Sequence, residues 1–122
     1  MICIGEGAAA IVLATGTFAL SWTHSVERTE WRERWVVEDG ALRITAASVM
    51  GSGAGVDPPE GAVLRGGAYH WRPDLPPVPK LVLAASGATG DGWTLCPEGG
   101  KCRMVGGRAG RPVTVEACGH QP

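Results

Sequence analysis

Apolar and polar residues alternate along two segments in the first half of the chain, residues 18–26 and 31–37. Successive side chains of a β-strand point to opposite faces, so this alternation predicts two strands that each bury one face. The residues expected on the buried faces are Phe18, Leu20, Trp22, His24, Val26, Trp31, Glu33, Trp35 and Val37. An Asp39-Gly40 pair follows, which is typical of a tight hairpin turn, and the alternation resumes from Leu42 through Ile44 to Ala46. The chain is therefore expected to begin with a three-stranded antiparallel meander.

The hairpin around Asp39-Gly40 has a predictable register. A two-residue loop makes the residues on its two sides cross-strand partners. The expected pairs are Glu38 with Ala41, Val37 with Leu42, and Trp35 with Ile44. Apolar residues then face apolar residues, which supports this register.

For the first hairpin, we take residues 27–30 as the loop. The expected pairs are then Val26 with Trp31, His24 with Glu33, Trp22 with Trp35, and Leu20 with Val37. This register gives each polar residue of the buried face a polar partner. A one-residue slip would turn Arg32 and Arg34 toward the core at a large cost.

The rest of the chain reads as short strands and turns. Its apolar runs are separated by glycines and prolines, of which the chain has 19 and 9, and this is typical of strands rather than helices. The further strands expected are residues 8–14, a hairpin over 62–71 that turns at Gly66-Gly67, and residues 80–85, 93–96, 101–105 and 112–117. Residues 73–79 should form an extended proline-rich connector, and Gly51–Gly55 a sharp loop. The pattern predicts an all-β fold, a small antiparallel sandwich or a partly open barrel.

Length and charge narrow the class of protein. The 122 residues fit a single domain over residues 1–122, long enough to bury a core. With 11 Lys and Arg residues against 12 Asp and Glu, the chain lacks the basic excess of nucleic-acid binders. The apolar stretch Ala8–Ala14 is too short to span a membrane, and no Lys or Arg precedes it as a signal peptide requires. We expect a buried strand there, no transmembrane span and no signal peptide.

One group of polar residues is the candidate site. His24 and Glu33 lie on an otherwise apolar face, and Glu27 is a second carboxylate in the adjoining turn. The third strand returns to the same edge of the sheet, so the Gly51–Gly55 loop should begin beside them. The expected ligand-binding residues are His24, Glu27, Glu33, Gly53 and Gly55, which could hold a small polar ligand, a cation or a peptide. The alternative is structural, with a buried pair that sets the register and a loop anchored through its amides.

The sequence contains no convincing catalytic motif. Ser25 follows His24 directly, but adjacent strand residues point to opposite faces, so they are not expected to form a catalytic dyad. The glycine loop lacks the G-x-G-x-x-G spacing of a dinucleotide site. We therefore expect no cofactor and no enzymatic activity. Of the five tryptophans, Trp22, Trp31 and Trp35 are expected in the core. Trp71 and Trp93 lie beside Pro and Gly segments and could line an exposed groove.

The four cysteines allow three interpretations. Cys96 and Cys102 flank a turn, so their Cα atoms should lie within about 7 Å of each other. Because Cys3 and Cys118 lie near the two ends of the chain, two disulfides are one interpretation. A metal site formed by Cys96, Cys102, Cys118 and His120 is the second, although the C-x5-C spacing is unlike that of structural zinc. Free thiols in a reducing compartment are the third.

The segment Thr23-His24-Ser25-Val26-Glu27 is distinctive, and it is followed by Glu33 and then by Gly51-Ser52-Gly53-Ala54-Gly55. In this order, after an aromatic residue, these elements resemble the bacterial family called domain of unknown function 1850. The likeness rests on residues 18–55 and continues more loosely into the second half of the chain.

The resemblance implies a role but no established activity. Members are often encoded beside fused permeases of tripartite, periplasmic-receptor-dependent (TRAP) transporters of the TAXI type. It therefore implies a non-enzymatic accessory domain with the permease or its receptor as partner. The alternative hypothesis is a small metal- or ligand-binding β-domain that uses His24, Glu27 and Glu33. Family association favours an extracytoplasmic or membrane-associated location, whereas the lack of an evident signal peptide favours the cytoplasm.

Overall fold

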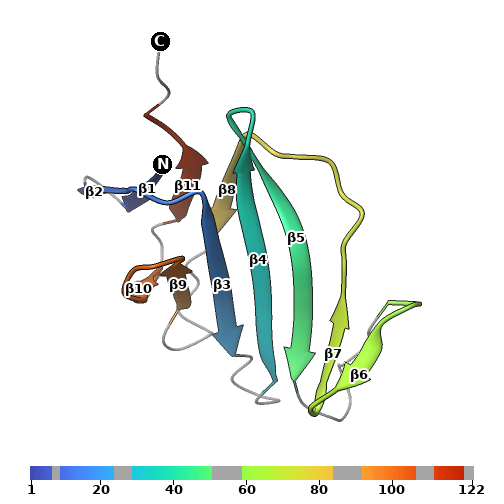
Figure 1. The fold of residues 1–122 in the computed structure, drawn as a ribbon. Helices are drawn as coiled ribbons and strands as arrows, with labels where there is room; N and C mark the ends of the chain where they lie inside the picture. The colour runs from blue at the N-terminus through green and yellow to red at the C-terminus, as the bar shows by residue number, and fades with distance from the viewer. Residues whose placement is uncertain (7–8, 24–28, 51–58, 84–91, 107–111, 120–122) are drawn as a thin grey trace.

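The structure is a computed structural model that describes residues 1–6, 9–23, 29–50, 59–83, 92–106 and 112–119. Within these residues it contains eleven strands and no helix (Figure 1). The strands pair antiparallel in two sheets that pack as an open sandwich and do not close into a barrel. This confirms the predicted all-β class and sandwich architecture. No helix in the described part of the chain is long and apolar enough to cross a membrane.

The smaller sheet has four strands in the order β2-β1-β11-β8. Their bounds are β1 (Ile2–Glu6), β2 (Ala9–Leu13), β8 (Lys80–Leu83) and β11 (Val113–Ala117). The first and last strands of the chain are neighbours here, since Ile4 pairs with Val115. A disulfide joins Cys3 to Cys118, whose Cα atoms are 5.8 Å apart. The two ends of the domain are thereby held in one sheet.

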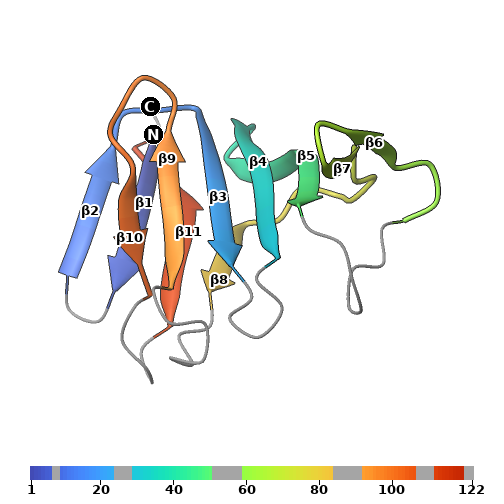
Figure 2. The same cartoon turned by 90° about the horizontal axis from the view of Figure 1, so that it is seen from below.

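The larger sheet has seven strands in the order β10-β9-β3-β4-β5-β7-β6. Their bounds are β3 (Thr17–Thr23), β4 (Glu30–Glu38), β5 (Ala41–Met50), β6 (Val63–Arg65), β7 (Ala68–Trp71), β9 (Trp93–Pro97) and β10 (Arg103–Val105). Strands β3, β4 and β5 form the predicted meander at its centre. Figure 2 shows the smaller sheet lying against the half with β9 and β3, while β6 and β7 extend beyond it.

The core lies between the two sheets. Its fully buried side chains include Ile2, Ile4, Val113 and Val115 from the smaller sheet and Phe18, Leu20, Leu42 and Leu95 from the larger. Burying one such side chain gains roughly 1.5–3 kcal/mol relative to leaving it exposed. Strand β1, which the sequence analysis did not anticipate, thus contributes two core residues. The expected strand at Ala8–Ala14 exists as β2, but only one of its faces is covered. Ile11 and Leu13 are partly buried against the core, whereas Val12 is 59% exposed because β2 lies at a sheet edge.

The hairpin between β4 and β5 has the predicted register. Its pairs include Glu38 with Ala41, Val37 with Leu42, and Trp35 with Ile44. Asp39 and Gly40 have φ angles of 54° and 77°, and positive φ at both central residues is what a type I′ turn requires.

The register predicted for the first hairpin is wrong. The pairs between β3 and β4 are Phe18 with Trp35, Leu20 with Glu33, Trp22 with Trp31, and Thr23 with Glu30. The cross-strand partner of Glu33 is therefore Leu20 and not His24. Residues 24–29 connect the two strands, where residues 27–30 were expected.

The observed register is shifted by four residues from the predicted one, since Leu20 pairs with Glu33 and not with Val37. An even shift leaves each side chain on the same face, so Phe18 and Leu20 reach the core as expected. The prediction weighed one polar pair between two strands. β3 also pairs with a third strand, with Leu20 opposite Leu95 of β9, and the first hairpin alone gives no information on that pairing.

Strand β5 contains a β-bulge. Ile44 pairs with Trp35, but Ala46 pairs with the preceding residue of β4, which leaves Thr45 as the extra residue. The buried residues of β5 on the two sides of the bulge are Leu42 and Ile44, then Ala47 and Val49. Ala46, which was expected on the buried face, lies on the outer face instead.

The remaining elements agree with the sequence. β6 and β7 form the predicted hairpin around Gly66-Gly67, where both glycines have positive φ. The strands expected in the second half are present as β8 to β11. The proline-rich connector contacts the larger sheet through a bridge between Val78 and Leu42. Cys96 and Cys102 form a disulfide with Cα atoms 4.1 Å apart, within the predicted distance.

Candidate functional site

The predicted ligand-binding rim lies only partly within the described residues. Glu33 is described, and the other members fall outside the described part of the chain: His24, Glu27, Gly53 and Gly55. The strand ends that flank these residues lie side by side at one end of strands β3, β4 and β5, since Thr23 pairs with Glu30 and Glu30 pairs with Met50. The five-residue site therefore stays a prediction.

Glu33 is a half-buried carboxylate on the inner face of β4. Its cross-strand neighbours are the apolar residues Leu20 and Ala47. Its Oε1 accepts a hydrogen bond of 3.1 Å from Nε1 of Trp35. Burial raises the pKa of the Glu33 carboxyl above its usual value, and the bond from Trp35 offsets part of that rise. The surroundings of Glu33 therefore favour the neutral form of its carboxyl more than water does.

Four tryptophans form a row across the same inner face. Trp22 stacks on Trp31 with ring centroids 6.0 Å apart, and it also contacts Trp93 at 4.4 Å. Trp31 in turn meets Trp71 edge-on at 6.4 Å. Each such contact stabilises by about 0.5–1.5 kcal/mol beyond the area it buries. The row links four strands of the larger sheet, and it includes Trp71 and Trp93, which the sequence analysis allowed in an exposed groove.

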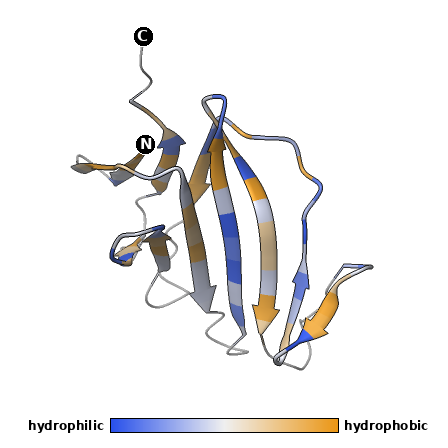
Figure 3. Ribbon diagram, in the orientation of Figure 1, coloured by the Kyte–Doolittle hydropathy of each residue, from blue (hydrophilic) through white to orange (hydrophobic). Residues whose placement is uncertain are grey.

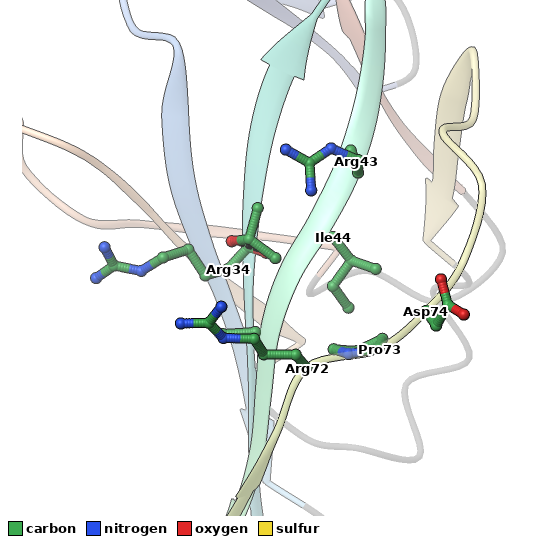
Figure 4. Close-up of a pocket in the computed structure, with 8 residues that line it drawn as sticks. Arg34, Arg43, Ile44, Arg72, Pro73 and Asp74 are labelled. Atoms are coloured by element: carbon green, nitrogen blue, oxygen red, sulfur yellow. Dashed lines mark hydrogen bonds between the residues drawn. The ribbon is translucent and has the colours of Figure 1, made fainter.

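A cleft of about 650 Å³ opens on the outer face of β4 and β5 (Figure 4). Three arginines line it from separate segments: Arg34 on β4, Arg43 on β5, and Arg72 directly after β7. Figure 4 shows their guanidinium groups extending toward the same side, with the carboxylate of Asp74 on the other side. Figure 3 shows the middle of β4 as more hydrophilic than β3 and β5 beside it. We call this space the arginine cleft.

The bulge in β5 forms the floor of the arginine cleft. Thr45 and Ala46 both line it, because the extra residue allows two successive side chains to face outward. The hydroxyl of Thr45 donates a hydrogen bond of 3.2 Å to the carbonyl of Arg34, which ties the bulge to β4. The bulge therefore directs Ala47 and Val49 to the buried face and leaves Thr45 and Ala46 on the outer face, where they line the cleft.

The arginine cleft is positively charged, although the whole chain has a net charge of −1. Nη2 of Arg43 lies 2.8 Å from Oε2 of Glu38, and the hydrogen bond and charge of Arg43 hold the pKa of Glu38 below its usual value. Arg34 and Arg72 are exposed, and neither forms an ion pair with any residue that the structure describes. Two permanent cations are thus available to a ligand.

The cysteines agree with the first of the three interpretations. Cys3 pairs with Cys118 and Cys96 with Cys102, so none of the four is free. Among the described residues, no three His, Cys, Asp or Glu side chains gather as a group that could hold a metal ion. His120, the remaining member of the metal-site interpretation, lies outside the described residues.

Comparison with known protein families shows to which family the chain belongs. Residues 18–104, well over half of its length, match the family model described as domain of unknown function (DUF1850). The chain belongs to the DUF1850 family. The DUF1850 match contains Glu33 and the three arginines of the cleft, whereas β1, β2 and β11 of the smaller sheet lie outside it. No curated protein and no solved structure matches the chain.

The arginine cleft was not predicted from the sequence, although part of the signal was present. The β4–β5 register, which was predicted and is confirmed, places Arg34 and Arg43 on the same outer face. The bulge could not be placed, because the sequence does not show that Ala47, rather than Ala46, is the buried residue. The third arginine could not be placed, because its position depends on the pairing of β7 with β5.

Proposed function

We propose that this DUF1850 chain is a non-enzymatic binding domain that acts as an accessory of a TRAP-type solute transporter. We propose further that it works on the extracytoplasmic side of the membrane, with the permease or its receptor as partner.

The arginine cleft is the observation that carries the binding role. A guanidinium group keeps its proton at every accessible pH, and its planar fork of donors matches the oxygens of an anion. Arg34, Arg43 and Arg72 are therefore suited to hold and orient an anionic group. General acid–base and nucleophilic catalysis need groups that exchange protons or attack, and guanidinium does neither. The cleft favours binding over catalysis.

The two disulfides support the extracytoplasmic location. Disulfides persist in oxidising compartments and are rare where glutathione and thioredoxin keep thiols reduced. The bond between Cys3 and Cys118 has a sequence separation of 115 residues, so it restricts almost the whole chain in the unfolded state. When the effect is attributed to the lower entropy of the unfolded chain, a disulfide that closes a loop of about 100 residues stabilises the folded state by about 4.7 kcal/mol. A domain that depends on such a bond gains from folding outside the cytoplasm.

The association with a transporter is supported by family membership. The sequence resembles a family whose members are often encoded beside fused TRAP permeases, and the family itself is established for residues 18–104.

Co-purification tests the partner. The tagged full chain, expressed in its own host and solubilised with the membranes, should recover a fused TRAP permease or its receptor after mild crosslinking. Uptake of the transported solute should fall when the chain is deleted and return when it is restored. Uptake that is unchanged in the deletion strain, with no permease or receptor recovered, would rule out the accessory role.

Alkylation followed by mass spectrometry tests the location. Protein isolated without reductant from its host should show no alkylatable thiols, and it should show four after denaturation and reduction. Four reactive thiols before reduction would argue against an oxidising compartment.

A further inference from the structure

We infer that the arginine cleft binds a small organic molecule with two anionic groups, carboxylate or phosphate, at opposite ends, and we use the word dianion for any molecule with two such groups, whatever the charge of each. This inference deepens the proposed binding function and rests on it, because it names the ligand class of the same cleft.

The spacing of Arg34 and Arg72 suits a ligand with two separate anionic groups. Arg34 pairs across β4 and β5 with Ala46, while Ala47 pairs with Trp71 on the other side of β5. The next residue, Arg72, follows Trp71 and comes level with Ala46, so Ala46 lies between the two arginines. Two strand spacings separate the Cα atoms of Arg34 and Arg72, roughly 10 Å. A ligand with two anionic groups can meet each guanidinium on its own side of Ala46, whereas one small oxoanion has to draw both long side chains together.

The third arginine has a different role, because it is already paired. The Glu38 carboxylate holds Arg43 through two hydrogen bonds, of 3.2 Å from Nε and 2.8 Å from Nη2. Arg43 thus adds positive potential to the cleft without offering its full set of donors. Asp74, on the connector, lies on the side away from the guanidinium groups and disfavours anions there (Figure 4). The anionic groups are thereby directed toward Arg34 and Arg72.

The size and charge of the molecule favour a small ligand over a polyanion. The cleft volume of about 650 Å³ falls within the range of small-molecule sites, about 300–1,000 Å³. A nucleic acid would meet a chain whose net charge is −1, without the broad basic surface that such partners need. The small side chain of Ala46 leaves the floor of the cleft low between the two cations, so a short carbon chain could cross it.

Binding to the purified full-length chain tests the inference. Titrations at low ionic strength, followed by two-dimensional NMR or calorimetry, would use four probes: adipate, fructose 1,6-bisphosphate, acetate and inorganic phosphate. We expect saturable binding of at least one of the two end-to-end dianions, at least about tenfold tighter than acetate or inorganic phosphate. The tighter of adipate and the bisphosphate identifies carboxylate or phosphate as the preferred group.

Charge-removing variants locate the site. Arg34→Gln and Arg72→Gln should each weaken dianion binding by about tenfold or more and reduce the preference over the single-group anions. The matched control is Arg32→Gln, because Arg32 is exposed on the same face of the same strand but is paired with Glu30 and does not line the cleft. It should change the affinity less than about twofold. Unchanged melting temperatures of all three variants show that folding is not the cause.

Several results would overturn the inference: no saturable binding of either dianion, equal affinity for inorganic phosphate, or an equal loss in Arg32→Gln. These outcomes are separable from failure of the proposed function. A domain that binds the dianions but recovers no transporter component has the site without the accessory role. A domain that recovers the permease but binds neither dianion has the role without the site.

Discussion

The two faces of β4 and β5 are built from alternate residues of the same two strands, yet they differ in what they contact. The inner face carries Trp35, Leu42 and Ile44 into the core, where the smaller sheet covers them. The outer face carries Arg34 and Arg43 into solvent, where they line the arginine cleft. The inner face is closed by packing, and the outer face is open to a ligand.

The bulge at Thr45 shows how one feature serves both faces. It places Thr45 and Ala46 outward together, so the outer floor gains room, and it returns Ala47 and Val49 to the core. A regular strand with the same sequence would have turned Val49 toward solvent. The comparison shows that core packing restricts which side chains the inner face can contain, whereas the outer face can contain polar residues suited to binding.

The largest expected difference between the two faces is in stability. Phe18→Ala removes a ring that is only 1% exposed and leaves a cavity between the sheets, so it should lower the free energy of unfolding by about 3–5 kcal/mol. Arg34→Gln on the outer face should change it by less than about 0.5 kcal/mol. Urea denaturation with all disulfides intact measures both. Comparable losses in the two variants would show that the outer face is structural.

Deleting Thr45 should separate the two roles of the bulge. Without Thr45, Ala46 would directly follow Ile44, so that Arg34 and Trp35 would pair with them without a bulge. The residues of β5 that are now buried would still point to the core. We expect the domain to fold with a loss of less than about 2 kcal/mol. Dianion binding should still fall, because the floor of the cleft is removed.

The matched control is deletion of Ser48, which lies beyond the bulge in a regular part of the strand. That change would turn Val49, which is 0% exposed, to the outer face and should destabilise the domain more than loss of Thr45. If removing Thr45 unfolds the domain while removing Ser48 does not, the bulge is needed by the core and not by the cleft.

Replacing Glu33 tests whether this half-buried carboxyl on the inner face lowers the stability of the domain. Because its pKa is raised, the folded state binds the proton more tightly than the unfolded state, so stability falls as pH rises from about 4.5 through the folded-state pKa. Glu33→Gln can still accept from Trp35 and should gain roughly 0.5–1 kcal/mol at pH 7. Thermal unfolding between pH 4 and pH 8 should show this gain disappearing toward the acid end. A loss of stability at pH 7 would point to a partner that needs the charge.

The smallest expected effect concerns the ion pair at the end of the cleft. Glu38→Gln frees Arg43 for a ligand and should tighten dianion binding by about two- to fivefold at pH 7 with little change in stability. Since Arg43 holds the pKa of Glu38 below its usual value, the pair persists to lower pH than for an ordinary carboxylate. The advantage of the variant should therefore last through mildly acidic pH and disappear as Glu38 protonates. Weaker binding in Glu38→Gln would mean that the pair positions Arg43 for the ligand.

The sequence by itself determined the local features of this protein. Alternation with period two assigned the faces of β3 and β4, and the Asp39-Gly40 turn set the β4–β5 register, because both depend on residues close in the chain. The strands of the second half, the Gly66-Gly67 hairpin and the proximity of Cys96 and Cys102 follow for the same reason. Family membership was also readable, since it rests on the order of short motifs.

Tertiary structure decided what depends on contacts between distant segments. Strand β3 pairs with β9 as well as with β4, so the pairing of His24 with Glu33 could not be judged from one hairpin. The smaller sheet joins β1 to β11, and no local pattern indicates such a neighbour. The arginine cleft needs β4, β5 and the residue after β7 together. Side chains brought together by long-range pairing leave little trace in a local pattern, because the energy that selects the pairing comes from the whole core.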